Sequence, residues 1–229
     1  MGSRMKELPL KRILFGPFII CLLMLTACAL QKPQTASPAA PTTRDRNFFK
    51  SPVTTENEKV EFIAHTENKP MKAYLSMNLP YPPYQVLFEQ IQKAEGIALT
   101  NRGEAHMTVI TPVEYDKVLK KHLNIAEIHK IAEATKIQEL PFTPVCIGKG
   151  QKELKGKLEK VYFVVVESPA LIELRGQIEE AYIKKGGKPQ EFVPERFFPH
   201  VTLGYSARDL HYEDGVLKNN KSCLYQFQQ

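Results

Sequence analysis

The sequence has few of the residues that build metal centres: its 229 residues include only four cysteines and six histidines. No CxxC pair and no cluster of His with Cys occurs, so the pattern of a structural zinc site is missing. A long apolar run is missing too, because the best candidate, residues 13–25, contains Gly16 and Pro17 and is shorter than the roughly 20 residues of a membrane span. From the cysteine and histidine pattern we expect no metal, and we expect no cofactor.

The first 27 residues nevertheless have the layout of a secretory signal peptide, with four basic residues ahead of the apolar run. The run ends in Leu25-Thr26-Ala27-Cys28, which resembles a bacterial lipobox, in which the cysteine is lipidated and begins the mature chain. We expect a signal peptide at 1–27 and lipidation of Cys28, with an uncleaved membrane anchor as the alternative. Ala29 is typical of lipoproteins that move to the outer membrane, so we expect a cell-envelope lipoprotein that faces the periplasm or the cell surface.

Positive charge is in small excess once this segment is removed. The full sequence has 31 Lys and Arg against 25 Asp and Glu, and residues 1–27 hold four of the basic residues and one acidic residue. The mature chain thus falls from a net charge of +6 to +3. This excess is too weak to favour binding to duplex DNA, but it would not repel a small phosphate ester.

Two cysteines, Cys146 and Cys223, remain in the part of the chain that folds. Export would permit a disulfide between them. The sequence does not show that their Cα atoms come close enough for a bridge. Two separate buried thiols are therefore the stronger expectation, and a disulfide is the alternative.

The composition divides the mature chain into a linker and a domain. Residues 28–70 are rich in Pro, Thr, Ser and Ala and predict a flexible linker, with a short strand at 60–64 as its single ordered candidate. Residues 71–229 predict an α+β domain, because strand and helix patterns alternate along them. We expect strands at 72–79, 105–110, 142–147, 161–166, 198–205 and 224–227, and helices at 85–95, 113–122, 125–136 and 171–183. The stretches "PYPPY" and "GKGQKELKGK" are expected to be turns.

A short motif, His, any residue, Thr and an apolar residue, occurs in two of the expected strands, at His106/Thr108 and His200/Thr202. The side-chain period of a strand places His and Thr on one face and the apolar residues on the other. If the two halves of the domain are related by pseudo-twofold symmetry, both pairs face one groove. One neutral imidazole can then accept a proton while a protonated one donates a proton. The threonine hydroxyls would donate to phosphate oxygens. The alternative for each histidine is a buried residue of the core.

With these motifs the sequence resembles the 2H phosphoesterases, which include RNA 2′,5′-ligase-like proteins and 2′,3′-cyclic phosphodiesterases. The resemblance covers residues 71–227 and is carried by the two motifs, by "FPHVTLG", and by the strand "VYFVVV" with the helix that follows it. It implies a bilobal α+β fold in which two pseudo-symmetric antiparallel sheets, in lobes of about 71–140 and 141–229, are flanked by helices around a central cleft. It also implies metal-independent hydrolysis or ligation at 2′,3′-cyclic or 2′,5′ linkages of nucleotides or RNA ends. His106 and His200 would be the acid and the base, in an order left open, and Thr108 and Thr202 would bind the phosphate.

One position departs from this family. Several members place an arginine where this chain has Tyr205, and strict alternation turns Tyr205 to the face opposite His200. Three basic residues could replace that arginine, or could instead be solvated surface charges: Arg102, Lys149 and Arg196. Further candidates for substrate binding are the polar face of the first strand and the aromatic residues beside the cleft, which could instead belong to the core: Tyr74, Ser76, Asn78, Tyr81, Tyr84, Phe197 and Phe198.

The expected partners are a nucleotide or short RNA substrate and, through the lipid, a membrane; duplex DNA is not expected, and the protein is expected to be a monomer. Two other functions stay open at this point. The domain could bind nucleotides or phosphate without turnover, or it could be a structural envelope component with buried histidines.

Overall fold

The computed structural model describes residues 49–52, 60–67 and 69–228. The expected signal peptide, Cys28 and most of the expected linker lie outside these residues. Within the described ranges, no helix combines the length and the hydrophobicity that crossing a membrane requires.

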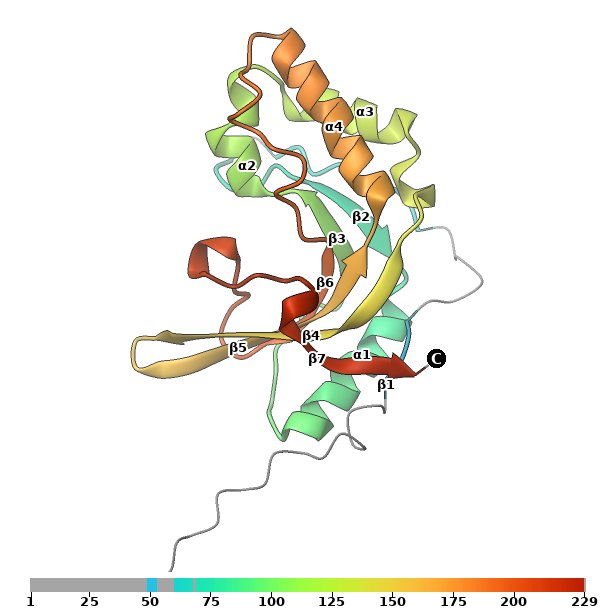
Figure 1. The fold of residues 1–229 in the computed structure, drawn as a ribbon, viewed down its shortest axis with the longest axis vertical. Helices are drawn as coiled ribbons and strands as arrows, with labels where there is room; N and C mark the ends of the chain where they lie inside the picture. The colour runs from blue at the N-terminus through green and yellow to red at the C-terminus, as the bar shows by residue number, and fades with distance from the viewer. Residues whose placement is uncertain (1–48, 53–59, 68, 229) are drawn as a thin grey trace, which may run out of the picture. The chain divides into compact units, whose positions relative to one another are not determined.

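The described strands join into one sheet with the order β1-β7-β4-β5-β6-β3-β2 (Figure 1). Neighbouring strands are antiparallel, except that β1 runs parallel to β7. The strands are Phe49–Lys50 (β1), Leu75–Leu79 (β2), Ala105–Ile110 (β3), Thr143–Leu154 (β4), Lys157–Glu167 (β5), His200–Tyr205 (β6) and Cys223–Gln228 (β7). The helices are Tyr81–Glu95 (α1), Pro112–Lys117 (α2), Ile125–Ala134 (α3) and Pro169–Lys184 (α4), and short 3-10 turns occupy Leu119–Lys121 (η2), Ile137–Glu139 (η3), Tyr212–Asp214 (η4) and Asn220–Ser222 (η5).

The expected α+β class is therefore confirmed, but the arrangement of the sheet differs from two separate sheets. Strands β3 and β6, which carry the two motifs, pair with each other at Met107 and Val201 and so join the two parts. Strands β3 and β2 form one side of this seam, and the other five strands, from β6 to β1, form the other side. The strand order alone does not establish the expected pseudo-twofold symmetry.

Helices from each half of the chain pack on strands from the other half. Helix α1 lies against β6, whereas α4 lies against β3 and α3. The carboxylate of Glu95, at the end of α1, accepts hydrogen bonds of 2.6 Å from the hydroxyls of both Tyr162 and Tyr225. Because the elements on each side of residue 140 pack on strands from the other side, the two expected lobes are not independent units.

The two faces of the sheet have different covers. On the helix face, alternate residues of β5 such as Tyr162 and Val164 pack with the buried residues of α1, α3 and α4. On the opposite face, which we call the motif face, Phe163 and Val165 pack with Leu210 and Val216. These last two residues belong to the segment 206–222, which connects β6 to β7 and covers part of the motif face.

Local sequence signals explain where several helices begin. Helices α2 and α3 both start at a capping box, Thr111 with Glu114 and Asn124 with Glu127, in which each pair exchanges side-chain and backbone hydrogen bonds. The stretch "PYPPY", expected to be a turn, instead opens α1, because prolines are tolerated in the first helical turn, where the N–H groups have no helical partner. The helix ends at Gly96, which has a φ of 60°.

The expected turn "GKGQKELKGK" is also different in the structure. Strand β4 runs through most of it, to Leu154, and β5 begins at Lys157. Only Lys155 and Gly156 form the loop, with φ angles of 50° and 76°. A two-residue loop with both residues in the left-handed region matches the twist of an antiparallel hairpin, so the strands continue to its edge.

The domain begins earlier in the chain than residue 71, which corrects the expected linker boundary. Phe49 is buried and pairs with Phe227 through β1 and β7. The amide of Gln138 donates to the carbonyl of Val60 at 2.9 Å. The strand expected at 60–64 does not form; an isolated bridge between His65 and Tyr74 follows it.

A disulfide joins Cys146 of β4 to Cys223 of β7, with Cα atoms 5.7 Å apart. The stronger expectation of two separate thiols was therefore wrong. The two cysteines are 77 residues apart in sequence, and only the pairing of β4 with β7 brings them together.

Candidate active site

The pairing of β3 with β6 brings the two motifs side by side. Met107 lies opposite Val201, so antiparallel alternation sets His106 opposite Thr202 and Thr108 opposite His200. Met107 and Val201 are fully buried, whereas the four motif residues are only partly buried, on the other face. Residues directly opposed in this way have Cβ atoms about 5 Å apart. All four side chains therefore share one small area of the motif face.

The imidazole of His200 is held in one tautomer. Its Nδ1 lies 2.7 Å from the carbonyl oxygen of Phe198, which can only accept, so Nδ1 carries the proton. Its Nε2 lies 3.1 Å from Nζ of Lys218, which donates to it. Burial, and then the positive charge of Lys218, lower the pKa of His200 to about 3. His200 is thus a neutral imidazole over the physiological pH range.

Sequence analysis missed two charged residues beside this histidine. Lys218 is 3% exposed, and its Nζ lies 2.7 Å from Oδ1 of Asp209 and 3.4 Å from Oγ1 of Thr202. The Thr202 hydroxyl donates in turn to Oδ2 of Asp209 at 3.1 Å. Burial by itself would raise the pKa of Asp209, but the charge and hydrogen bond of Lys218, together with the charges of His211 and His200, hold that pKa below its usual value. Burial lowers the pKa of Lys218, and Asp209 opposes this shift.

Both charged residues lie in the segment 206–222, which the sequence shows only as a polar loop. Gly150 allows this segment to lie close to the sheet, because a Cβ there would be 2.3 Å from Cγ1 of Val216. The disulfide at Cys223 holds the end of the segment to β4. The apolar residues Leu210 and Val216 were the sequence signal that this loop packs on the sheet and brings Lys218 to the motif.

The surroundings of His106 differ from those of His200. Nδ1 of His106 lies 3.5 Å from Oε1 of Glu104. Burial lowers the pKa of His106, whereas Glu104 acts to raise it. Among the described residues, the Thr108 hydroxyl has no hydrogen-bond partner. Ser76 and Asn78 of β2 lie opposite Thr108 and His106, so they share the motif face as expected.

Tyr205 lies on the motif face, which corrects the expectation that it points away from His200. In the pairing of β5 with β6, Phe163 lies opposite Thr202, yet the preceding residue, Tyr162, lies opposite Gly204. The extra residue is a β-bulge, which reverses the alternation beyond it. Tyr205 therefore lies opposite Val161 and packs with the residues of the motif face.

The remaining sequence candidates fall into different places. Lys149 binds Glu95 at 2.8 Å on the helix face, so it is not the missing cation of the site. Tyr84 is 4% exposed within the core and has no free ring face for a base, and the Tyr81 hydroxyl accepts a hydrogen bond from Asn101. Tyr74 stacks on His65 with ring centroids 3.9 Å apart.

Arg102 and Arg196 are both exposed. The charge of Arg102 contributes to lowering the pKa of His106. Arg102 therefore lies near enough to the site to act on His106. The role of Arg196 as a replacement for the family's arginine stays a prediction. No group of three or more His, Cys, Asp or Glu side chains in the described ranges is placed to hold a metal ion.

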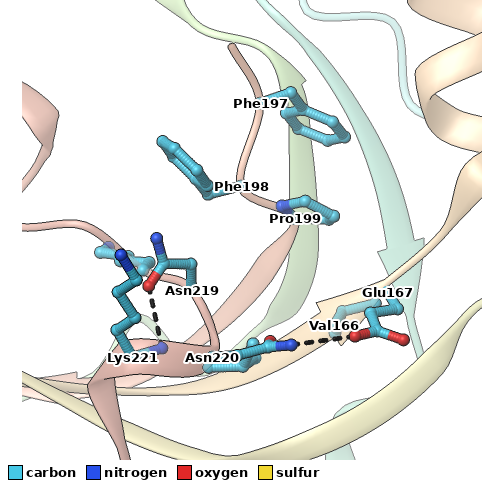
Figure 2. A pocket seen from close by; sticks show the side chains of 10 residues that line it. Val166, Glu167, Phe197, Phe198, Pro199, Asn219, Asn220 and Lys221 are labelled. Atoms are coloured by element: carbon cyan, nitrogen blue, oxygen red, sulfur yellow. Dashed lines mark hydrogen bonds between the residues drawn. The ribbon is translucent and has the colours of Figure 1, made fainter. Parts of the chain in front are cut away.

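A pocket of about 310 Å³ lies next to the second motif and is lined by Pro199, which precedes His200, and by Lys218, which contacts it (Figure 2). Phe197, Phe198 and Pro199, which precede β6, form one wall of it. The opposite wall comes from the turn that follows Lys218, and it carries the amides of Asn219 and Asn220 and the ammonium of Lys221. Lys218 borders both this pocket and the motif residues. Of the aromatic residues expected near the cleft, Phe197 and Phe198 are thus in a position to contact a ligand.

The paired His-x-Thr strands that meet on one face of an α+β sheet agree with the resemblance to the 2H phosphoesterases. Residues 73–211 match the model of the family described as "Swiss Army Knife, 2H phosphoesterase domain". The match spans more than half of the chain, so the chain belongs to this family. No curated protein and no solved structure matches the sequence of this chain. The match includes both motifs and Asp209, and it ends before Lys218 and the disulfide partner Cys223.

Proposed function

We propose that the protein is a metal-independent phosphoesterase that acts on 2′,3′-cyclic or 2′,5′-linked nucleotides or RNA ends. The observation that carries the proposal is the register of β3 and β6, which sets two imidazoles and two threonines on one face. One phosphate group on the motif face, above these two strands, would be within reach of an acid and a base at once.

The charged neighbours support an assignment of the two roles. His200 is neutral, and Nε2 is the nitrogen that faces the site, so His200 acts as the general base toward the attacking water or hydroxyl. Burial lowers the pKa of His106, but Glu104 opposes this shift and favours the protonated form, so His106 acts as the general acid toward the leaving oxygen. Thr108, whose hydroxyl is open, donates to a non-bridging oxygen of the phosphate.

The pocket beside His200 supports a nucleoside substrate. The ring of Phe198 offers a surface on which a base can stack, and the amides of Asn219 and Asn220 can donate and accept hydrogen bonds. The Nδ2 of Asn220 already donates to Glu167, which orients that amide within the wall (Figure 2). Tyr74 and Asn78 would line the other side of the site, next to His106, whereas Ser76 is only 1% exposed and would not contact the substrate.

The test is a screen of 2′,3′-cyclic, 3′,5′-cyclic and 2′,5′-linked nucleotides, with the product identified as the 2′- or 3′-phosphate. We expect turnover of a 2′,3′-cyclic or 2′,5′-linked substrate in the presence of EDTA. His106→Ala and His200→Ala should each lose roughly 100- to 10,000-fold in rate. Full activity in both single variants would falsify the proposal.

A second candidate is nucleotide or phosphate binding without turnover. One observation favours it: in the free protein the lone pair of His200 Nε2 already accepts from Lys218 and is not available to a substrate proton. Tight binding of a nucleoside 2′,3′-cyclic phosphate with no product after prolonged incubation would support this function over the first.

We also propose that the protein is a monomer that is lipidated on Cys28 in the cell envelope and faces the periplasm or the cell surface. The lipobox-like sequence at residues 25–28 supports this location. Cys28→Ala should abolish incorporation of labelled fatty acid and release the protein from the membrane fraction, and sedimentation of the protein without residues 1–28 should give the mass of one chain.

A further inference from the structure

The ammonium of Lys218 lies among three acceptors. Its Nζ is 2.7 Å from Oδ1 of Asp209, 3.1 Å from Nε2 of His200 and 3.4 Å from Oγ1 of Thr202. An ammonium has three N–H donors, and here each has an acceptor. Two of the three acceptors belong to the second His-x-Thr motif, so the charge is placed where a phosphate would bind.

The hydroxyl of Thr202 is not available as a donor to a phosphate. Its proton is directed at Oδ2 of Asp209, 3.1 Å away, and its oxygen accepts from Lys218. A hydroxyl has a single proton to donate. On the β6 side of the site, the donor that can reach a phosphate oxygen is therefore the ammonium of Lys218.

Lys218 is also open toward a ligand, although its side chain is 3% exposed. It forms part of the wall of the pocket that Phe198 and Asn219 line, and it lies over the ring of Phe163 at 5.4 Å. The ring and Asp209 hold the side chain in place. A phosphate that reaches the motif face of β3 and β6 from this pocket thus meets a positioned cation.

We propose that Lys218 is a catalytic residue that binds a non-bridging phosphate oxygen, which replaces Nε2 of His200 as the acceptor of one of its N–H groups. This proposal rests on the proposed function. The exchange frees the lone pair of Nε2, so the imidazole becomes a base only when the phosphate is present. Asp209 is a positioning residue, because it holds both Lys218 and Thr202.

A purely structural ion pair is the competing explanation for Lys218 and Asp209, and the chain offers a matched control. Lys149 also pairs with a carboxylate, Glu95, at 2.8 Å, and it is 23% exposed. That pair lies on the helix face and contacts tyrosine hydroxyls rather than motif residues. Lys149→Met therefore removes a lysine from a comparable pair without touching the site.

The experiment measures three quantities in the wild type, Lys218→Met, Lys218→Arg and Lys149→Met. These are the affinity for inorganic phosphate and for adenosine 2′- and 3′-monophosphate, the kcat/KM for the substrate found in the screen, and the titration of His200 by NMR. Lys218→Met combined with Asp209→Asn is the fourth variant, because it leaves no unpaired buried carboxylate if the single variant fails to fold.

We expect Lys218→Met, or the double variant, to lose at least roughly tenfold in phosphate affinity and about 100-fold in kcat/KM. Lys218→Arg should retain part of the phosphate affinity, since it keeps the charge. The midpoint of the His200 titration should rise in Lys218→Met, because a cation that faces the ring is gone, while Asp209 and His211 remain close to it. Lys149→Met should stay within about threefold of the wild type in phosphate affinity and in kcat/KM.

The two proposals fail in different ways. If His106→Ala and His200→Ala lose activity while Lys218→Met and the double variant keep their phosphate affinity and kcat/KM, the role of Lys218 is overturned and the proposed function stands. If the wild type turns over no substrate but Lys218→Met still loses phosphate affinity, the proposed function fails and Lys218 remains a phosphate ligand.

Discussion

Strands β3 and β6 carry the same motif, yet His106 has a carboxylate as its charged neighbour and His200 has an ammonium. Glu104 lies 3.5 Å from Nδ1 of His106, and Lys218 lies 3.1 Å from Nε2 of His200. The first neighbour favours the protonated imidazole, and the second favours the neutral one. The residues outside the repeated motif thus give two chemically identical side chains different charged surroundings, and this difference is the basis of the proposed assignment of acid and base.

The threonines differ in the same way. Thr202 is bonded to Asp209, whereas the Thr108 hydroxyl has no partner within the described ranges. The segment 206–222 is the source of this difference, because its Asp209 and Lys218 form hydrogen bonds with His200 and Thr202 of β6, whereas they act on His106 of β3 only through their charge. In the proposed function, the motif would therefore supply the reacting groups, and one connecting segment would assign their roles.

The largest expected effect concerns this segment. Reduction of the Cys146–Cys223 disulfide should lower the free energy of unfolding by about 4 kcal/mol, since the bridge closes a long loop in the unfolded chain. Thermal unfolding with and without a reductant measures it. Hydrogen exchange should show residues 212–222 losing protection more than β2 and β3 do. The Cys146→Ala/Cys223→Ala variant should match the reduced protein and be insensitive to the reductant. Equal loss of protection in both regions would contradict the claim that the bridge specifically holds the β6 side.

The next effect separates the two threonines. Thr108→Val should lower kcat/KM by roughly 100-fold, because it removes a donor to the phosphate. Thr202→Val should lower it by about tenfold or less, because that hydroxyl donates to Asp209 instead. Thr108→Ser, which keeps the hydroxyl, should recover most of the activity. Equal losses in the two valine variants would mean that both threonines contact the phosphate.

In the pH profile of kcat/KM, each of the two histidines should be responsible for one limb. The pKa of His200 is lowered to about 3, and burial lowers that of His106 from its usual value of 6.5. Because the base must be neutral and the acid protonated, kcat/KM should be bell-shaped with its maximum below pH 6.5. A maximum above pH 7 would be incompatible with this assignment. Assays from pH 3 to 8 measure it.

The same shift links stability to pH and provides a necessary control. Between pH 6.5 and about pH 3, the unfolded chain binds a proton at His200 that the folded protein does not. Stability should therefore fall as the pH decreases through this window. Circular dichroism at each pH distinguishes loss of fold from loss of the general base on the acidic limb.

The sequence was sufficient to predict what depends on local patterns. Alternation placed His and Thr of each motif on one face, and the pairing of Met107 with Val201 confirms that both pairs share it. The same rule failed at Tyr205, because a β-bulge at Leu203 adds one residue and reverses the face. The glycine in "TLGY" is a residue that often marks a bulge, but whether one forms, and at which residue, depends on how β6 fits against β5.

The parts that the sequence did not predict depend on contacts between distant segments. Asp209 and Lys218 lie in a polar loop, where charged residues are usually solvated, and only the packing of Leu210 and Val216 turns them toward β6. The disulfide depends in the same way on the pairing of β4 with β7. The chemistry was therefore readable from the motif, whereas the cation that complements it required the fold.

The smallest expected effect tests the charged neighbour of His106. Glu104→Gln removes a carboxylate that raises the pKa of His106, so the alkaline limb of kcat/KM should move to lower pH. Because the Glu104 side chain is 53% exposed, its effect is screened by solvent and the loss at pH 7 should be only a few-fold. Glu153→Gln, an exposed change on the β4–β5 hairpin, should leave the profile unchanged and serves as the control. A shift of the acidic limb in Glu104→Gln would indicate that His106 is the base, because each limb reports the residue whose charged neighbour was removed.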